Sequence, residues 1–144
     1  MKNFKYIVIF FIFFLLTCVK ERPRDIFRKI NNAIKKNDIN ALKNCYTEET
    51  QILFSKLDET QGSQIPWYEQ IIQAGVQEEP KVIKEKIEKN RAFLTIEHQN
   101  RQANISLIKV GNEWKLDLTK ELTFILNIIE QQKMMEEREK TEKK

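Results

Sequence analysis

Cysteine and histidine, which supply many nucleophiles and zinc ligands, are scarce in this chain. Its 144 residues include two cysteines, Cys18 and Cys45, and one histidine, His98. This set cannot supply the nitrogen and sulfur ligands of a zinc site, and no acidic run has the spacing of a calcium loop. The three glycines do not form a phosphate-binding pattern, so no motif for nucleotide binding is found. The sequence also lacks the Gly-x-Ser-x-Gly motif of a serine nucleophile. We therefore expect no metal and no cofactor.

Four side chains are candidates for lining a ligand pocket: Trp67, Tyr68, His98 and Trp114. By strand alternation His98 falls on the same face as Leu94 and Ile96, where an imidazole could act as a base inside an apolar cavity. The alternative is a rim position beside a turn, partly in water. Likewise, the aromatic residues could line a pocket or simply fill the core. We favour the structural role for all four, because a lone histidine and buried aromatic rings are weak evidence of a site.

The chain begins with a short hydrophobic leader. Lys2 and Lys5 make its start positive, and residues 6–16 form an uninterrupted apolar run of eleven. As a helix this run would span about 17 Å, well short of the roughly 30 Å of a bilayer core. Its length and charge are typical of a signal peptide, which we assign to residues 1–17.

The leader ends in Leu15-Leu16-Thr17-Cys18, which resembles the lipobox of bacterial lipoprotein signal peptides. Thr17 departs from the small residue that usually precedes the cysteine. The resemblance implies that Cys18 is the first mature residue and carries acyl chains, with residues 18–24 as a lipidated tether. The protein would then be exported and lipid-anchored in the bacterial cell envelope. A plain secreted protein and an uncleaved anchor remain alternatives. With Cys18 acylated, Cys45 is the only free thiol, and we expect it to be buried.

The charge of the mature chain argues against nucleic-acid binding. The formal charge is +4, but without residues 1–17 there are 23 basic and 21 acidic side chains. The charges alternate in sign instead of gathering as one basic run, so we interpret them as a solvated surface and expect no nucleic-acid partner.

The first half of the mature chain reads as helical. Apolar residues recur at helical spacing after Asp25 and again after Asp38, and either aspartate could cap the helix that follows it. Another helix is predicted between Pro66 and Gly75. The stretch from 47 to 57 is ambiguous and suggests one or two further helical turns.

The pattern changes to strands after Pro80. Runs with a period of two, separated by turn residues at 90, 100–101 and 111–112, predict a four-stranded antiparallel meander with one face toward a core. Phe93, Ile108 and Val110 fall on its other face, which a partner or the last helix could cover. A helix begins near Thr119 with apolar residues around most of its circumference, followed by a charged tail. We expect an α+β domain at 25–118, and an amphipathic C-terminal helix with its tail at 119–144.

Two stretches resemble small bacterial lipoproteins of the cone-shaped nuclear-transport-factor-2-like (NTF2-like) superfamily. Residues 34–42, Ile-Lys-Lys-Asn-Asp-Ile-Asn-Ala-Leu, are similar to the break between its first two helices. Residues 107–116, Leu-Ile-Lys-Val-Gly-Asn-Glu-Trp-Lys-Leu, are similar to its closing hairpin. Both are structural signatures, and together they cover under a fifth of the chain. The resemblance implies N-terminal helices packed on a curved sheet, a pocket between them, and dimers formed through a sheet face.

These features predict a non-enzymatic, membrane-anchored envelope lipoprotein that binds a protein partner or a small apolar ligand. The sheet face or the C-terminal helix could mediate a homodimer or hold a partner. The alternative is a small isomerase- or hydrolase-like enzyme that acts in the cone pocket, with His98 or Tyr68 as its proton-transfer group. A lipoprotein that neutralises a toxin cannot be distinguished from the first hypothesis by sequence.

Overall fold

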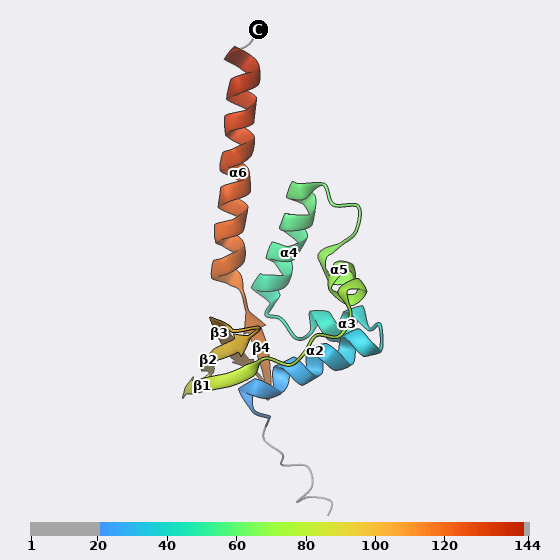
Figure 1. Ribbon diagram of the computed structural model, residues 1–144, viewed down its shortest axis with the longest axis vertical. Helices are drawn as coiled ribbons and strands as arrows, with labels where there is room; N and C mark the ends of the chain where they lie inside the picture. Colours follow the sequence, from blue (N-terminus) through green and yellow to red (C-terminus); the bar gives the residue numbers. More distant parts are fainter. Residues whose placement is uncertain (1–20, 143–144) are drawn as a thin grey trace, which may run out of the picture.

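The computed structural model describes residues 21–142, which form an α+β fold (Figure 1). The predicted signal peptide at 1–17 and the predicted lipidation site at Cys18 lie outside the described residues. The helices come first, then four strands, then one long C-terminal helix. Across residues 21–142, no helix combines the length and apolar content needed to cross a membrane.

The chain enters through a short 3-10 turn, η1 (Pro23–Asp25), and two helices, α2 (Ile26–Lys35) and α3 (Ile39–Lys43). Asp38 caps α3 as predicted, because its Oδ1 accepts a hydrogen bond from the Ala41 N–H at 2.9 Å. Asp25 precedes α2, but its carboxylate accepts instead from the Arg22 N–H at 3.0 Å. The η1 turn that it stabilises therefore takes the place of a side-chain cap on α2.

The ambiguous stretch after residue 47 forms a full helix, α4 (Glu48–Gln61), which is followed by α5 (Trp67–Ala74). Thr47 begins α4 by accepting from the Thr50 N–H at 3.3 Å. Gly62 ends the helix with φ 61°, a left-handed conformation that glycine adopts without steric cost. Both carboxylate oxygens of Asp58 accept from the Trp67 N–H, at 3.0 and 3.1 Å. This contact fixes the start of α5 against the last turn of α4.

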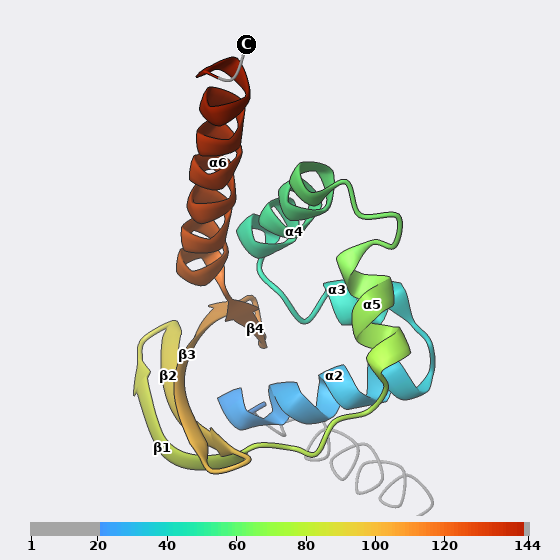
Figure 2. The ribbon, with the colours of Figure 1, turned by 45° about the horizontal axis from the view of Figure 1, so that its top comes forward.

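The four predicted strands are confirmed. They pair antiparallel in sequence order: β1 (Lys81–Glu88), β2 (Arg91–His98), β3 (Arg101–Val110) and β4 (Glu113–Asp117). At the β2–β3 turn, Gln99 and Asn100 both have positive φ, at 49° and 60°, as expected for a two-residue hairpin loop. The sheet is curved, and its concave side faces α2 (Figure 2).

Backbone pairing joins the helices to the sheet. Between α3 and α4, the Cys45 carbonyl accepts from the Leu116 N–H at 2.8 Å, and the Thr47 N–H donates to the Leu116 carbonyl at 2.9 Å. Tyr46 thereby forms a parallel bridge with Leu116 on β4, the last strand of the sheet. One turn further, the fully buried hydroxyl of Thr50 accepts from the Leu118 N–H at 3.0 Å. These bonds fix α4 beside the point where the sheet ends.

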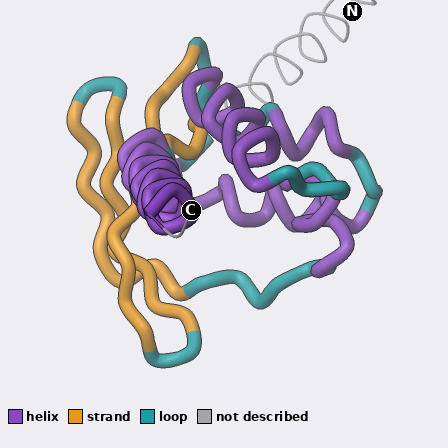
Figure 3. Tube along the Cα trace, turned by 90° about the horizontal axis from the view of Figure 1, so that it is seen from above, coloured by secondary structure: helices purple, strands orange, loops and turns teal. Residues whose placement is uncertain are grey.

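A single apolar core fills the space between the helices and the inner face of the sheet, and the strands gather on one side of the fold (Figure 3). The inner face contributes Ala92, Leu94, Leu107, Trp114 and Leu116, all of which are buried. The predicted inward face is therefore confirmed at these positions.

The last helix, α6 (Thr119–Glu142), packs against α4. Leu122 and Leu126 are buried on its α4 side. On the outer face of the sheet, Phe93 and Val110 remain 39% and 51% exposed. The first turn of α6 approaches this face, because Lys120 and Glu121 line one small cavity with Phe93. It therefore covers the outer face only in part.

We predict that Thr50→Val destabilises the fold. Valine keeps the shape of the side chain but cannot accept the hydrogen bond from the Leu118 N–H, which would remain unpaired in a partly buried site. The expected loss in the free energy of unfolding is about 1–3 kcal/mol, measured by urea denaturation. Thr123→Val is the matched control, because that hydroxyl is exposed on α6 and donates only to the Thr119 carbonyl within the helix. Equal stability of the two variants would contradict the role given to Thr50.

Candidate functional site

The structure brings two of the predicted pocket residues together, Trp67 and Tyr68 on α5. The Trp67 ring stacks on Phe54 with 5.6 Å between centroids, and the Tyr68 ring meets Phe54 edge-on at 5.3 Å. Tyr46 closes the cluster at 5.9 Å from Tyr68. The Tyr68 hydroxyl is buried with no hydrogen-bond partner among the described residues, and burial raises its pKa. These rings occupy the space between α4 and α5, as core side chains do.

Trp114 and His98 lie elsewhere. Trp114 is 4% exposed on β4, and its Nε1–H donates to the Glu21 carbonyl at 3.2 Å. His98 is the last residue of β2, where it pairs with Arg101 across the hairpin and is partly exposed. The four candidates therefore lie in three separate parts of the fold.

A cleft of about 320 Å³ opens between α2, α3 and the start of β4. Its lining includes Lys29, Asn32, Asp38, Cys45 and Glu113. These residues come from segments more than sixty positions apart, and no local motif marks them. Sequence reasoning missed this cleft, because only the packing of α2 against β4 creates it.

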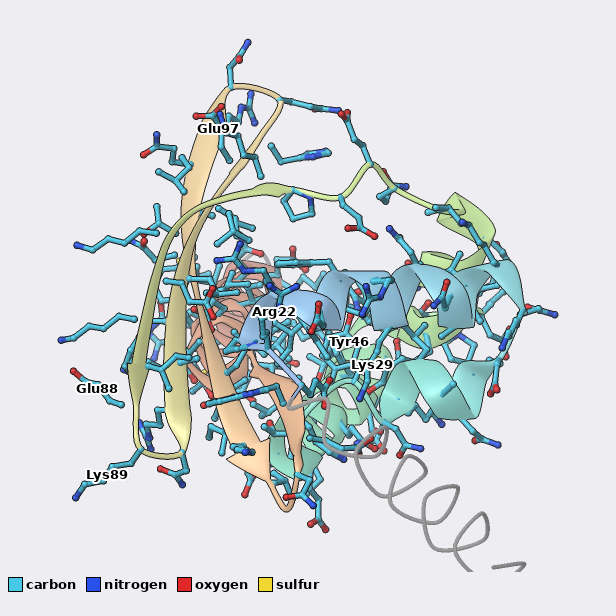
Figure 4. The ribbon with its side chains drawn as sticks, turned by 90° about the horizontal axis from the view of Figure 1, so that it is seen from below. Arg22, Lys29, Tyr46, Glu88, Lys89 and Glu97 are labelled. Carbon is cyan, nitrogen blue, oxygen red and sulfur yellow. The ribbon has the colours of Figure 1, made fainter. Side chains whose placement is uncertain are left out.

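Two charged groups of the cleft, Lys29 and Glu113, form an ion pair. The Lys29 ammonium lies 2.9 Å from a carboxylate oxygen of Glu21 and 3.2 Å from one of Glu113. Burial lowers the pKa of Lys29, but the two carboxylates outweigh it and the net shift is upward, so the side chain stays an ammonium. Figure 4 shows Lys29 on α2, at the side of the fold where Arg22 also lies. A lysine in this state cannot serve as a base near neutral pH.

The thiol of the cleft is also unreactive. Cys45 is 4% exposed, and its Sγ donates to the Ala41 carbonyl at 3.4 Å. Burial raises its pKa from 9.0 to about 11, so it remains a neutral thiol where a nucleophile would need to be a thiolate. Among the described residues, no group of three or more His, Cys, Asp or Glu side chains could hold a metal ion. The cleft therefore offers polar contacts but no activated group.

The second candidate is an exposed apolar surface on α6, which we call the α6 stripe. It consists of Phe124, Ile125, Ile128 and Met135, which are 66%, 40%, 38% and 57% exposed. Four large apolar side chains this exposed along one helix indicate an interaction surface. The C-terminal part of α6 extends past the end of α4 (Figures 1 and 2). The sequence predicted a helix with apolar residues around most of its circumference, and in the structure α4 does not cover the side that carries this stripe.

Comparison of the chain with protein-family models, with curated proteins and with solved structures gives no match. The α+β class, the four-stranded antiparallel sheet and the C-terminal helix are features of the structure itself. Membership of the NTF2-like superfamily stays a prediction.

We predict that Cys45 makes the free energy of unfolding depend on pH only above about pH 9. The folded-state pKa is raised to about 11 from 9.0, so the neutral thiol is favoured in the fold. Its contribution is complete below about pH 9 and is lost as the pH rises toward 11. Chemical denaturation of Cys18→Ala and of Cys18→Ala/Cys45→Ala between pH 7 and 11 should show a steeper decline in the chain that retains Cys45. Identical pH profiles would contradict the burial of this thiol.

Proposed function

We propose that this protein is a non-enzymatic, lipid-anchored lipoprotein of the bacterial cell envelope that binds a protein partner through the α6 stripe. The single observation that carries the binding role is the exposure of Phe124, Ile125, Ile128 and Met135 on a helix that projects from the domain. A protein partner suits this surface better than a small ligand, because the stripe follows one side of a helix and is not enclosed.

The anchor is supported by the leader, and the way the chain enters the domain limits how far the domain would lie from the bilayer. The leader stops at Cys18, and Glu21 follows three residues later. Glu21 is held by its contact with Lys29 and by the Trp114 indole, and Arg24 lies 2.5 Å from a Glu85 carboxylate oxygen. Glu21, the buried Pro23 and Arg24 of the predicted tether thus contact the domain, whereas the Arg22 side chain is exposed. Three extended residues reach about 11 Å at most, so an acylated Cys18 would hold the domain close to the bilayer.

The non-enzymatic role is supported by the state of the candidate groups. In the cleft, Lys29 is an ion-paired ammonium and Cys45 a neutral thiol. Tyr68 is enclosed by aromatic rings, and His98 lies at a hairpin on another part of the fold. The alternative of an isomerase- or hydrolase-like enzyme needs a proton-transfer group beside a substrate-sized cavity. No observation places either residue in such a position.

The anchor predicts fatty-acid labelling at one residue. Cells that express the full chain with radiolabelled palmitate should label the wild type and the Cys45→Ala variant, because the acyl chains would be attached to Cys18 alone. The Cys18→Ala variant should lose the label and leave the membrane fraction. Continued labelling of Cys18→Ala, or its loss from Cys45→Ala, would contradict the proposed anchor.

The docking role predicts contacts from one side of α6. A photo-crosslinking amino acid at Phe124 should form a discrete adduct with another polypeptide in intact cells. The same amino acid at Asn127 is the matched control, because Asn127 is also exposed on α6 but lines the groove beside α4. Absence of an adduct from Phe124, or equal adducts from both positions, would exclude the α6 stripe as the docking surface.

A further inference from the structure

The spacing of the α6 stripe is that of a coiled-coil seam. Ile125, Ile128, Gln132 and Met135 follow one another at intervals of three, four and three residues, which matches alternating a and d positions of a heptad. At about 100° per residue these four lie on one side of α6, and Phe124 borders them. Leu122, Leu126 and the partly buried Ile129 lie on the side packed against α4. A second helix could therefore pack on α6 without displacing α4.

The end of α6 also indicates a missing neighbour. The Lys133 ammonium reaches the Thr60 carbonyl near the end of α4. Beyond it, α6 continues to Glu142 and extends past α4 as a single helix (Figure 1). Helical segments this short are marginal in water unless they pack against something. A helical partner along the seam would supply that packing.

We propose that the partner is a second copy of this chain, and that the two α6 helices pair in parallel. This inference rests on the proposed function, because it names the partner that the α6 stripe binds. In a parallel pair each a or d residue meets its own counterpart, so Ile125, Ile128 and Met135 pack on themselves. The Gln132 amides of the two copies meet at an a position, where one polar pair sets the register of two helices. Each Gln132 amide can donate to and accept from the other.

The positions of the anchor and of α6 select the parallel arrangement. The start of η1 and the tip of α6 lie at opposite ends of the long axis of the molecule (Figure 1). The spacer between Cys18 and Glu21 reaches only about 11 Å. Two anchored copies therefore stand with α6 pointing the same way. An antiparallel pair would lift one anchor from the bilayer by most of the length of α6, about 36 Å for 24 residues.

The flanking residues fit this pair. In a parallel coiled coil the g position of one helix faces the following e position of the other, which sets Gln131 against Glu136 without a like-charge contact. At the base of α6 the preceding d position is Glu121, and two facing carboxylates would repel. The pairing we propose therefore begins at Ile125. The seam is short, but two copies confined to one membrane have a high effective concentration, which favours their association.

Disulfide trapping in membranes tests this pair. Full-length chains carrying Ile125→Cys or Met135→Cys are expressed separately, and their membranes are treated with copper phenanthroline. Each should yield a disulfide-linked homodimer, because each position faces itself across a parallel seam. Met134→Cys is the matched control: Met134 and Met135 are adjacent, and both are about half exposed, at 52% and 57%. Met134 points away from the seam and should yield only background dimer.

Co-expression of differently tagged Ile125→Cys and Met135→Cys chains distinguishes the orientations. A parallel pair gives homodimers and no mixed dimer, whereas an antiparallel pair gives the mixed dimer and overturns the proposal. The proposal is also overturned by equal yields at positions 134 and 135, by a disulfide to a protein of another mass, or by no dimer at all. Palmitate labelling of the same samples tests the acylation of Cys18 separately. Labelled chains without dimers reject the pairing alone, and parallel dimers of unlabelled chains reject the anchor alone.

Discussion

The fold depends on the pairing of residues 45–47 with Leu116. Two backbone hydrogen bonds attach the connection between α3 and α4 to the free edge of β4, and the buried Thr50 hydroxyl continues the attachment to Leu118. Because this connection lies between α3 and α4, its position aligns both helices with the sheet. The same joint sets the start of α6, since Leu118 directly precedes it. An otherwise exposed strand edge is covered in this way, and the helical half and the sheet share one core.

Periodicity and local turn chemistry were sufficient to predict most of the elements. Alternating apolar residues gave the four strands and their inward face, and Asp38 marked the start of α3 through the hydrogen bond that it forms. The sequence predicted only one or two helical turns where α4 forms, because the apolar residues of α4 are few and its polar residues are spread around the helix. Its helical state follows from the Thr47 cap, from Gly62 and from the attachment of Thr50 to Leu118. That last bond joins residues 68 positions apart, which no local pattern reveals.

The candidate sites likewise divide into features that the local sequence predicts and features that only tertiary contacts create. The α6 stripe lies on a helix in which the sequence shows apolar residues around most of the circumference. Packing of α6 against α4 determines that the stripe is exposed. The cleft between α2, α3 and β4 was missed, because it joins Lys29 and Cys45 to Glu113 across the fold. Trp67, Tyr68, His98 and Trp114 were grouped as candidates by residue type. Tertiary structure keeps Trp67 and Tyr68 together on α5 and places the other two elsewhere. It also gives Trp114 a hydrogen bond to the Glu21 carbonyl that sequence reasoning did not consider.

The hydrogen bond between Trp114 and the Glu21 carbonyl has a consequence for the order of folding and of the proposed processing at Cys18. The Trp114 indole and the Lys29 ammonium hold Glu21 on the domain, only three residues from Cys18. The enzymes that would cleave the chain before Cys18 and acylate it, as proposed, would need access to the residues around it. If the chain is processed as proposed, the folded domain would hinder access to those residues, because it holds Glu21 in place. The proposed processing would therefore come before β4 packs on the domain. The hydrogen bond from Trp114 to the Glu21 carbonyl would then form late in folding.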